Sequence, residues 1–456
     1  KEQLQRFYIR MGIQIMLNYL LDTQDLHYEN LIAHGEYPIF VDIEIICGNI
    51  KKYHNNMTAK EKAEWIFSSS VLGNGILPSI NENDNMFCSL IGQGGIKTNK
   101  KVQKIMNPMT STMHLSYINA VTSEQYNRPS INGLFCKYNN FIKELLQGFT
   151  WAYHYIKNNS SIFKNKISFT YSRILFKNTQ SYSKLLQLSY DPIFLTDGGD
   201  RQLILSKYYP NDSNDKKTIF ELELRVLIKG DIPYFSIRNN ERNLYLNNTA
   251  LSVPDYLQIA PQSYLQMRIN NLSNSDYNFQ SWLIYNALNI EKKKLFPNTI
   301  NRFNSNNLIY NVDKICEMIG DHLVNVAIVN DSSTDIVWTI NRKKSGIYIS
   351  DMYLYEGIAG MTIFFAALYR RLPKDTYQNI EKILIEKLKN YTISTLRSSK
   401  ISMTGAFTGE ASIVYAYLVL YKIKQNSIYL YYAELHEKVL YRLLRHDSKY
   451  DLLCGN

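Results

Sequence analysis

The spacing of apolar residues over the first 300 residues predicts a mixture of helices and strands. We expect a helix from Gln3 to Leu21, then a strand, a turn at His34–Gly35–Glu36 and a second strand. Residues 137–157 carry apolar side chains at helical spacing, and residues 168–187 change from a strand pattern to a helical one. A helix within residues 218–236 is expected to end at Lys229–Gly230, because glycine is the favoured residue after a helix C-terminus.

Turn-forming residues interrupt this pattern in three places. Residues 60–80 predict a helix followed by a strand-and-turn segment that contains Gly73, Gly75 and Pro78. The polar stretch 81–130 predicts a loop or a lid, and the polar stretch 298–307 predicts a linker.

After about residue 345 the pattern becomes helical and repetitive. Residues 354–369 and 405–421 each combine a glycine-bearing turn with a uniformly apolar helix, and residues 379–395 predict an outer helix between them. Gly357 and Gly409 occupy equivalent places in the two copies. Such a period indicates helical hairpins that stack as an array or close into a toroid.

Composition narrows the class of protein without naming a function. The 456 residues suggest two to three domains, and no apolar run of about 18 residues predicts a membrane span. The net charge of +11 is spread along the chain, which favours a solvated basic surface over a nucleic-acid site. Five scattered cysteines without a CxxC pair predict neither disulfides nor a zinc site, and they fit a reducing cytoplasm.

Candidate chemistry is densest in residues 25–44, DLHYENLIAHGEYPIFVDIE. Asp25, His27 and Asn30 form the pattern D-x-H-x-x-N, and the predicted hairpin brings Asp42 and Glu44 back toward them. Phosphoryl transfer needs a carboxylate to orient the attacking hydroxyl, and hard oxygen ligands to hold divalent metal against the phosphates. The spacing therefore predicts a metal–nucleotide site similar to the catalytic loop of lipid kinases.

Several further segments carry a resemblance to a known family. They are SSSVLGNGILP, NRPSING, SRILFKNTQSY, ELRVLIKGDIPYF, RINNLSNSDYNFQ and the two apolar repeats, in that order. With residues 25–44 they resemble class II lanthipeptide synthetases of the LanM type over essentially the whole chain. The resemblance implies an α+β lipid-kinase-like C-lobe with added helical elements, followed by the first part of an all-α LanC-like (α/α) toroid. The implied domains are a dehydratase at 1–305, a connecting helical segment at 306–345 and the start of a cyclase at 346–456.

The resemblance also implies an activity and its residues. ATP-dependent phosphorylation of Ser and Thr in a ribosomally made precursor peptide, then phosphate elimination, gives dehydroalanine and dehydrobutyrine, and a cyclase adds Cys thiols to form thioether rings. It assigns the catalytic roles to Asp25, His27, Arg173 and Thr179, and the ATP and Mg²⁺ contacts to Asn30, Asp42 and Glu44. It implies a cytoplasmic enzyme that binds no nucleic acid and allows association with a membrane exporter.

The chain departs from the family pattern in informative places. Gly73–Asn74 stands where Arg-Thr is usual, Lys177 where Arg is usual and Asp191 where His is usual. Glu223 and Asp231 belong to a family motif, and we expect both to be structural. The resemblance places the nucleotide-binding N-lobe before this chain and the zinc ligands of the cyclase beyond Asn456. A stand-alone kinase-like phosphotransferase and an inactive remnant or scaffold remain alternatives at this point.

Overall fold

A computed structural model describes residues 1–54, 56–78, 87–92, 97–121, 126–210, 214–247, 250–288, 312–342, 346–398, 403–447 and 451–455. The chain divides into two compact units, one of residues 1–54 and 67–291 and one of residues 55–66 and 292–456. The expected domain limits at 305 and 345 lie outside the described residues and stay predictions, as does the linker at 298–307. Within the described residues, no helix is both long and apolar enough to cross a membrane.

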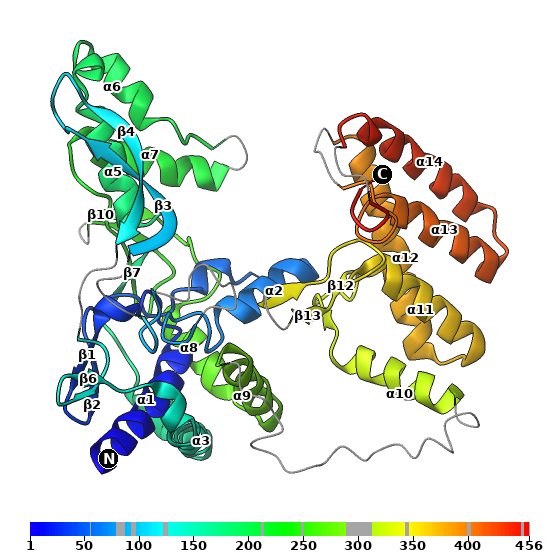
Figure 1. The fold of residues 1–456 in the computed structure, drawn as a ribbon, viewed down its shortest axis with the longest axis horizontal. Coiled ribbons are helices and arrows are strands. Elements are labelled where there is room, and N and C mark those ends of the chain that lie inside the picture. The colour runs from blue at the N-terminus through cyan, green and yellow to red at the C-terminus, as the bar shows by residue number, and fades with distance from the viewer. Residues whose placement is uncertain are drawn as a thin grey trace. The chain divides into compact units, whose positions relative to one another are not determined.

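The first unit is a mixed α/β structure (Figure 1). Its helices are α1 (Glu2–Leu21), the last residues of α2 (Ala59–Ser68), α3 (Ile142–Asn158), α4 (Ser160–Lys166), α5 (Thr179–Ser189), α6 (Gly198–Leu205), α7 (Asn214–Ile228), α8 (Pro261–Asn270) and α9 (Asn274–Ala287). Its strands are β1 (Leu31–His34), β2 (Tyr37–Phe40), β3 (Lys97–Met106), β4 (His114–Val121), β5 (Ser130–Ile131), β6 (Leu134–Phe135), β7 (Tyr171–Ile174), β8 (Phe235–Arg238), β9 (Leu244–Leu246) and β10 (Ala250–Val253). The predicted α+β class of this part is confirmed at this coarse level.

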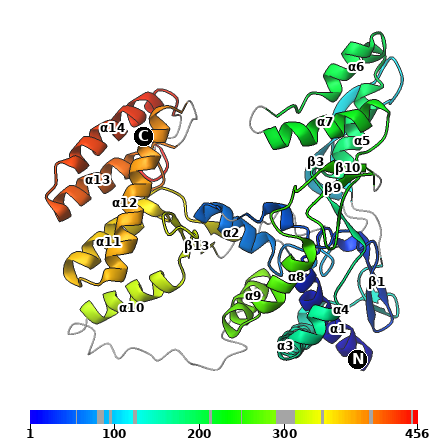
Figure 2. The ribbon, with the colours of Figure 1, turned by 180° about the vertical axis from the view of Figure 1, so that it is seen from behind.

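Helices α1 and α3 form the tightest helix pair of this unit and lie side by side in Figures 1 and 2. Two glycines make this close approach possible. A methyl group added at Gly12 of α1 would lie 1.9 Å from the carbonyl oxygen of Leu145 on α3. A methyl group added at Gly148 of α3 would lie 1.9 Å from the carbonyl oxygen of Ile9 on α1. The backbones therefore meet where neither helix has a side chain.

Two small sheets carry the elements that matter for the site. Strands β1 and β2 pair as an antiparallel hairpin, with Leu31 opposite Phe40 and His34 opposite Tyr37, as predicted. A second antiparallel sheet has the strand order β10-β9-β8-β7. Strand β7 leads into α5, so the predicted change from strand to helix within 168–187 is confirmed. Helix α7 ends as predicted, with Gly230 at φ +83°.

Two predictions for this unit are wrong. Within the stretch 81–130, expected to be a loop or lid, β3 and β4 form a long antiparallel hairpin. The stretch 69–77, expected to contain a strand, consists of consecutive turns. Its apolar residues Val71, Ile76 and Leu77 are buried without a partner strand. Tertiary packing, rather than sheet pairing, therefore explains their hydrophobicity.

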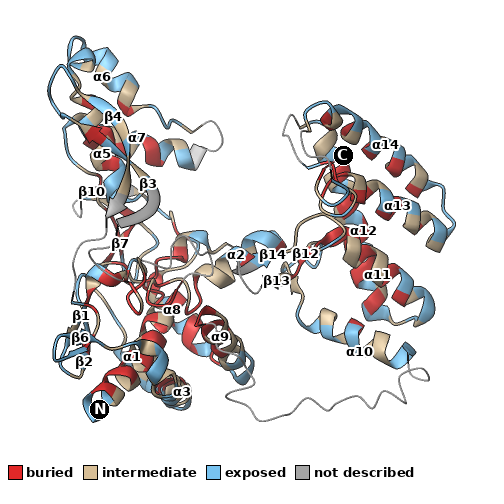
Figure 3. Ribbon diagram, in the orientation of Figure 1, coloured by how far each residue is buried: buried red, intermediate tan, exposed pale blue. Residues whose placement is uncertain are grey.

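The second unit contains α10 (Val312–Asn325), α11 (Ile358–Arg371), α12 (Asp375–Leu396), α13 (Ala411–Lys424) and α14 (Ile428–Leu444), and the strands β11 (Ile328–Val329), β12 (Ile336–Val337), β13 (Thr339–Arg342) and β14 (Gly346–Ile349). The strands form two antiparallel hairpins, where a helical connection was expected up to residue 345. Helix α11 packs against α12 and α13, and α14 packs against α12 and α13. Buried residues recur along one face of these helices (Figure 3), as expected for stacked helical hairpins.

Candidate active site

The loop that carries Asp25 and His27 begins where α1 ends. Asp22 ends the helix at φ +51°, and its buried carboxylate accepts hydrogen bonds from the backbone N–H and the amide of Asn49 at 2.9 and 2.8 Å and from Tyr264 at 3.0 Å. The buried Arg268 donates to the carbonyl oxygens of Leu20, at 3.1 Å, and of Tyr19. The end of α1 is thus fixed by charged and polar groups from distant parts of the sequence.

Two turn segments support the loop from behind. The backbone N–H of Leu26 donates to the carbonyl oxygen of Asn74 at 2.9 Å. The hydroxyl of Ser89 donates to the carbonyl oxygens of Leu26 and His27 at 2.5 and 3.0 Å. Asn74, one of the departures from the family pattern, is buried and uses its side-chain oxygen to accept from the backbone N–H of Ile76 at 3.0 Å. It therefore shapes the support of the loop.

The three residues of the D-x-H-x-x-N pattern lie in one tight turn. Asp25 adopts a left-handed backbone conformation, with φ +65°. The side-chain amide of Asn30 donates to the backbone oxygen of Asp25 at 2.8 Å, so its own carbonyl oxygen is the atom that a cation would use. His27 Nε2 lies 4.0 Å from Asp25 Oδ1, and His27 Nδ1 accepts from the backbone N–H of Glu29 at 3.2 Å.

Asp42, which follows the hairpin, lies near this turn. The backbone N–H of Val41 donates to the carbonyl oxygen of Asn30 at 2.9 Å, and Asp42 follows with φ +59°. Burial raises the pKa of the Asp25 carboxyl above its ordinary value; the positive charge of His27 lowers it, and the negative charge of Asp42 raises it further. The two carboxylates therefore repel each other, which a bound divalent cation would relieve.

The predicted elimination residues meet the same site through Glu44. The backbone N–H of Arg173 on β7 donates to the carbonyl oxygen of Glu44 at 2.9 Å, and Arg173 Nη1 lies 2.5 Å from Glu44 Oε1. Arg173 Nη2 donates to the hydroxyl of Thr179 at 3.1 Å, and its guanidinium lies 5.1 Å from the centre of the Tyr234 ring. One guanidinium thus joins residues that are more than 100 positions apart in the sequence.

Lys177 and Glu223 lie behind this cluster. Glu223 is 1% exposed, and it forms an ion pair with Lys177 and accepts from the hydroxyl of Tyr182 at 2.6 Å. Burial raises the pKa of the Tyr182 hydroxyl, and the hydrogen bond to Glu223 raises it further. Asp231 accepts from the backbone N–H of Ile232 at 2.8 Å just after α7 ends. These contacts agree with the structural roles expected for Glu223 and Asp231.

The donor set fits magnesium in the presence of a nucleotide. Within the described ranges, no three His, Cys, Asp or Glu side chains gather as a metal site. Asp42 and the amide of Asn30 nevertheless supply hard oxygen atoms, and Mg²⁺ is commonly held by one or two carboxylates together with substrate phosphates. Glu44 is engaged by Arg173, and its predicted contact with metal stays a prediction, as do the roles of the other site residues.

The sequence patterns did not reveal the residues that hold the loop in place. Asp22, Asn49, Asn74, Ser89 and Arg268 all act through contacts to distant backbone or side-chain groups. Asn74 and Arg268 lie in the segments SSSVLGNGILP and RINNLSNSDYNFQ, which carry the family resemblance, but neither segment indicates this supporting role.

Comparison with known proteins places these observations in a family. Residues 1–238 match the family model described as a domain of unknown function, DUF4135, and residues 348–456 match the model described as lanthionine synthetase C-like protein. The chain is 23% identical over 420 residues to the Lacticin 481/lactococcin biosynthesis protein LcnDR2 of Lactococcus lactis subsp. lactis. This match covers 86% of the chain and 44% of the relative, so the chain spans less than half of that protein's length. The chain belongs to the DUF4135 family and, with its lanthionine synthetase C-like domain, to the LanM-type lanthipeptide synthetases.

Proposed function

We propose that the first unit dehydrates Ser and Thr residues of a ribosomally made precursor peptide, by phosphorylation with ATP followed by elimination of phosphate. The C-terminal helical hairpins would belong to the domain that adds Cys thiols to the dehydrated residues. The observation that carries the proposal is the position of Arg173, which contacts both Glu44 beside the predicted metal residues and Thr179.

Each side chain has a role that follows from its surroundings. Bound ATP and Mg²⁺ would supply the phosphoryl group and neutralise its charge, with Asn30 and Asp42 as the holding residues. Asp25 would accept the proton of the substrate hydroxyl, and its raised pKa brings it closer to the value that suits a general base near neutral pH. His27, 4.0 Å from Asp25, would lie beside the transferred group.

Elimination needs a partner for the departing phosphate. The guanidinium of Arg173 has the planar fork that matches phosphate oxygens, and its contact with Thr179 fixes its direction. The side chain of Arg173 is 13% exposed, so its electrostatic interactions are stronger than those of a fully solvated arginine. A kinase alone has no need for this residue pair, which favours the two-step reaction over a stand-alone phosphotransferase.

Co-expression of the gene with its precursor peptide tests the proposal. Mass spectrometry should show losses of about 18 Da for each modified Ser or Thr. Arg173→Ala and Thr179→Ala should instead accumulate phosphorylated peptide, and Asp25→Asn should leave the peptide unmodified. Arg242→Ala removes an exposed arginine that pairs with Asp255, and it serves as the control that should dehydrate normally. An unmodified peptide from the Arg173→Ala enzyme would contradict the assigned division of roles.

A further inference from the structure

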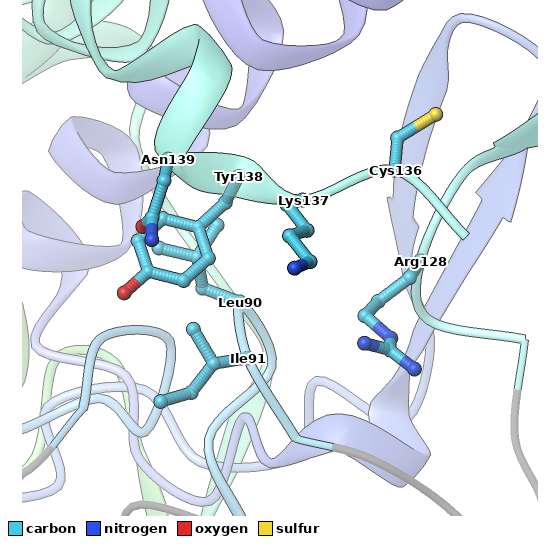
Figure 4. A pocket seen from close by; sticks show the side chains of 7 residues that line it. All are labelled: Leu90, Ile91, Arg128, Cys136, Lys137, Tyr138 and Asn139. Atoms are coloured by element: carbon cyan, nitrogen blue, oxygen red, sulfur yellow. The ribbon is translucent and has the colours of Figure 1, made fainter.

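A pocket of about 290 Å³ lies in the first unit, beside the support of the candidate catalytic loop. Leu90 and Ile91 form one wall, and Arg128 and the segment 136–139 form the other (Figure 4). The side chain of Lys137 points into the space in front of Leu90 and Ile91, whereas the thiol of Cys136 points away (Figure 4). The pocket therefore combines an apolar wall with two cations.

Among the residues that the structure describes, neither Arg128 nor Lys137 forms an ion pair with a carboxylate. The guanidinium of Arg128 lies 4.6 Å from the centre of the Phe135 ring, within the range of a cation–π contact. Burial lowers the pKa of Arg128, and the nearby Tyr8 opposes this effect. The cation thus lies against an aromatic ring and is partly desolvated, and partial desolvation strengthens an interaction with an anion.

Hydrogen bonds connect the pocket directly to the candidate active site. The side-chain amide of Asn127 donates to the carbonyl oxygens of Ser89 and Gly92, both at 2.9 Å, and so clamps the wall that contains Leu90 and Ile91. The hydroxyl of Ser89 in turn donates to the carbonyl oxygen of His27. Asn127 and Arg128 both belong to the NRPSING segment, which the proposed reaction does not otherwise use.

We propose that this pocket binds an acidic segment of the peptide substrate. A carboxylate would pair with Arg128 and Lys137, and the methylene groups of the same side chain would pack on Leu90 and Ile91. The apolar wall favours an aspartate or glutamate side chain over a bare phosphate ion. The inference that the ligand is a peptide rests on the proposed function. The contact would hold the peptide next to Asp25 and His27, so that binding energy is used to position the target hydroxyl.

A titration with synthetic peptides tests the pocket without relying on the dehydration reaction. Fluorescein-labelled hexaglutamate should bind the protein in a fluorescence anisotropy assay, and labelled hexaglutamine should not. Arg128→Gln should weaken hexaglutamate binding about tenfold, because a forked charge-assisted contact is lost. Lys137→Gln should weaken it about threefold, as expected for an exposed ion pair. Arg128→Lys, which keeps the charge and loses the fork, should lie between these variants and the wild type.

Lys166→Gln is the matched control, because it removes one positive charge from an exposed position at the end of α4 in the same unit. Its effect should stay below about twofold. The proposal is overturned if wild-type protein does not bind hexaglutamate, if it binds both peptides equally, or if Arg128→Gln and Lys166→Gln behave alike. Thermal unfolding of each variant confirms that the compared proteins are equally folded.

The precursor peptide then tests the role of the pocket in the reaction. Arg128→Gln should raise KM for dehydration about tenfold and leave kcat unchanged, because the residue holds the peptide without touching the reacting atoms. A lowered kcat with unchanged KM would contradict this role. If wild-type enzyme does not dehydrate the peptide, the proposed function fails, while the hexaglutamate titration still decides whether the pocket binds acidic peptides.

Discussion

The close approach of α1 and α3 gives a prediction that can be worked out from the structure. In Gly12→Ala, the new methyl group must move from 1.9 Å to about 3.4 Å from the carbonyl oxygen of Leu145, which requires a shift of about 1.5 Å. The obstacle is backbone, so it cannot rotate away. Overpacking of this kind costs about 3 kcal/mol at the upper end of its usual range, and the better helix propensity of alanine offsets about 1 kcal/mol. We therefore expect Gly12→Ala to lower the free energy of unfolding by about 2 kcal/mol.

Hydrogen exchange followed by mass spectrometry measures this loss where it occurs. Amides in peptides that cover residues 2–21 and 142–158 should exchange about 30-fold faster in Gly12→Ala than in wild type. Gly148→Ala should behave similarly, and the double variant should cost less than the sum, because one separation of the helices accommodates both methyl groups. Gly198→Ala is the control, since a methyl group there meets no atom within 4 Å. Exchange in Gly12→Ala as slow as in Gly198→Ala would refute the reasoning.

Three further changes test other parts of the structure. Folding raises the pKa of the Asp25 carboxyl, which favours its neutral form, so the stability of the protein falls as pH rises through that pKa. Asp25→Asn should therefore increase the melting temperature at pH 7, with a smaller gain at pH 4. Equal gains at both pH values would contradict this sign. Glu29 also raises the pKa of Asp25, so Glu29→Gln should move the acidic limb of the kcat–pH profile to lower pH, and a shift to higher pH would be inconsistent with the charge arrangement. The side chains of His436 and Glu410 are both fully buried, and His436 Nε2 lies 2.8 Å from Glu410 Oε2. Glu410→Ala should therefore destabilise the second unit by about 3–5 kcal/mol, measured by the hydrogen exchange of amides in α13 and α14. An unchanged exchange rate would show that the pair contributes little.

Local patterns predicted the elements that have regular apolar spacing or a clear turn signal. Helix α3 and the hairpin of β1 and β2 followed from spacing and turn residues alone. The hairpin of β3 and β4 did not, because its sequence is rich in lysine and other polar residues and Ile105 is a rare buried position in it. A two-stranded ribbon with little buried surface has no strong alternation for sequence analysis to detect.

In the candidate site, too, local patterns predicted some features and missed others. Asp25, His27, Asn30 and Asp42 could be grouped from the sequence because a single helix, turn and hairpin connect them. Arg173 and Glu44 lie 129 positions apart in the sequence, and no local pattern predicts their contact. A family resemblance selected Arg173, but only the fold shows which carboxylate it meets.

The path of the chain between the two compact units has a consequence for dividing this protein into pieces. Residues 55–66 belong to the second unit, where Ala59 and Ala63 pack against Val337 and the backbone N–H of Ala59 donates to Asp335 at 2.8 Å. A cut between the two large blocks of sequence would leave this segment on the wrong piece. A C-terminal piece expressed alone should therefore lack the contacts of Ala59 and Ala63, because the second unit is not encoded by one uninterrupted stretch of the gene.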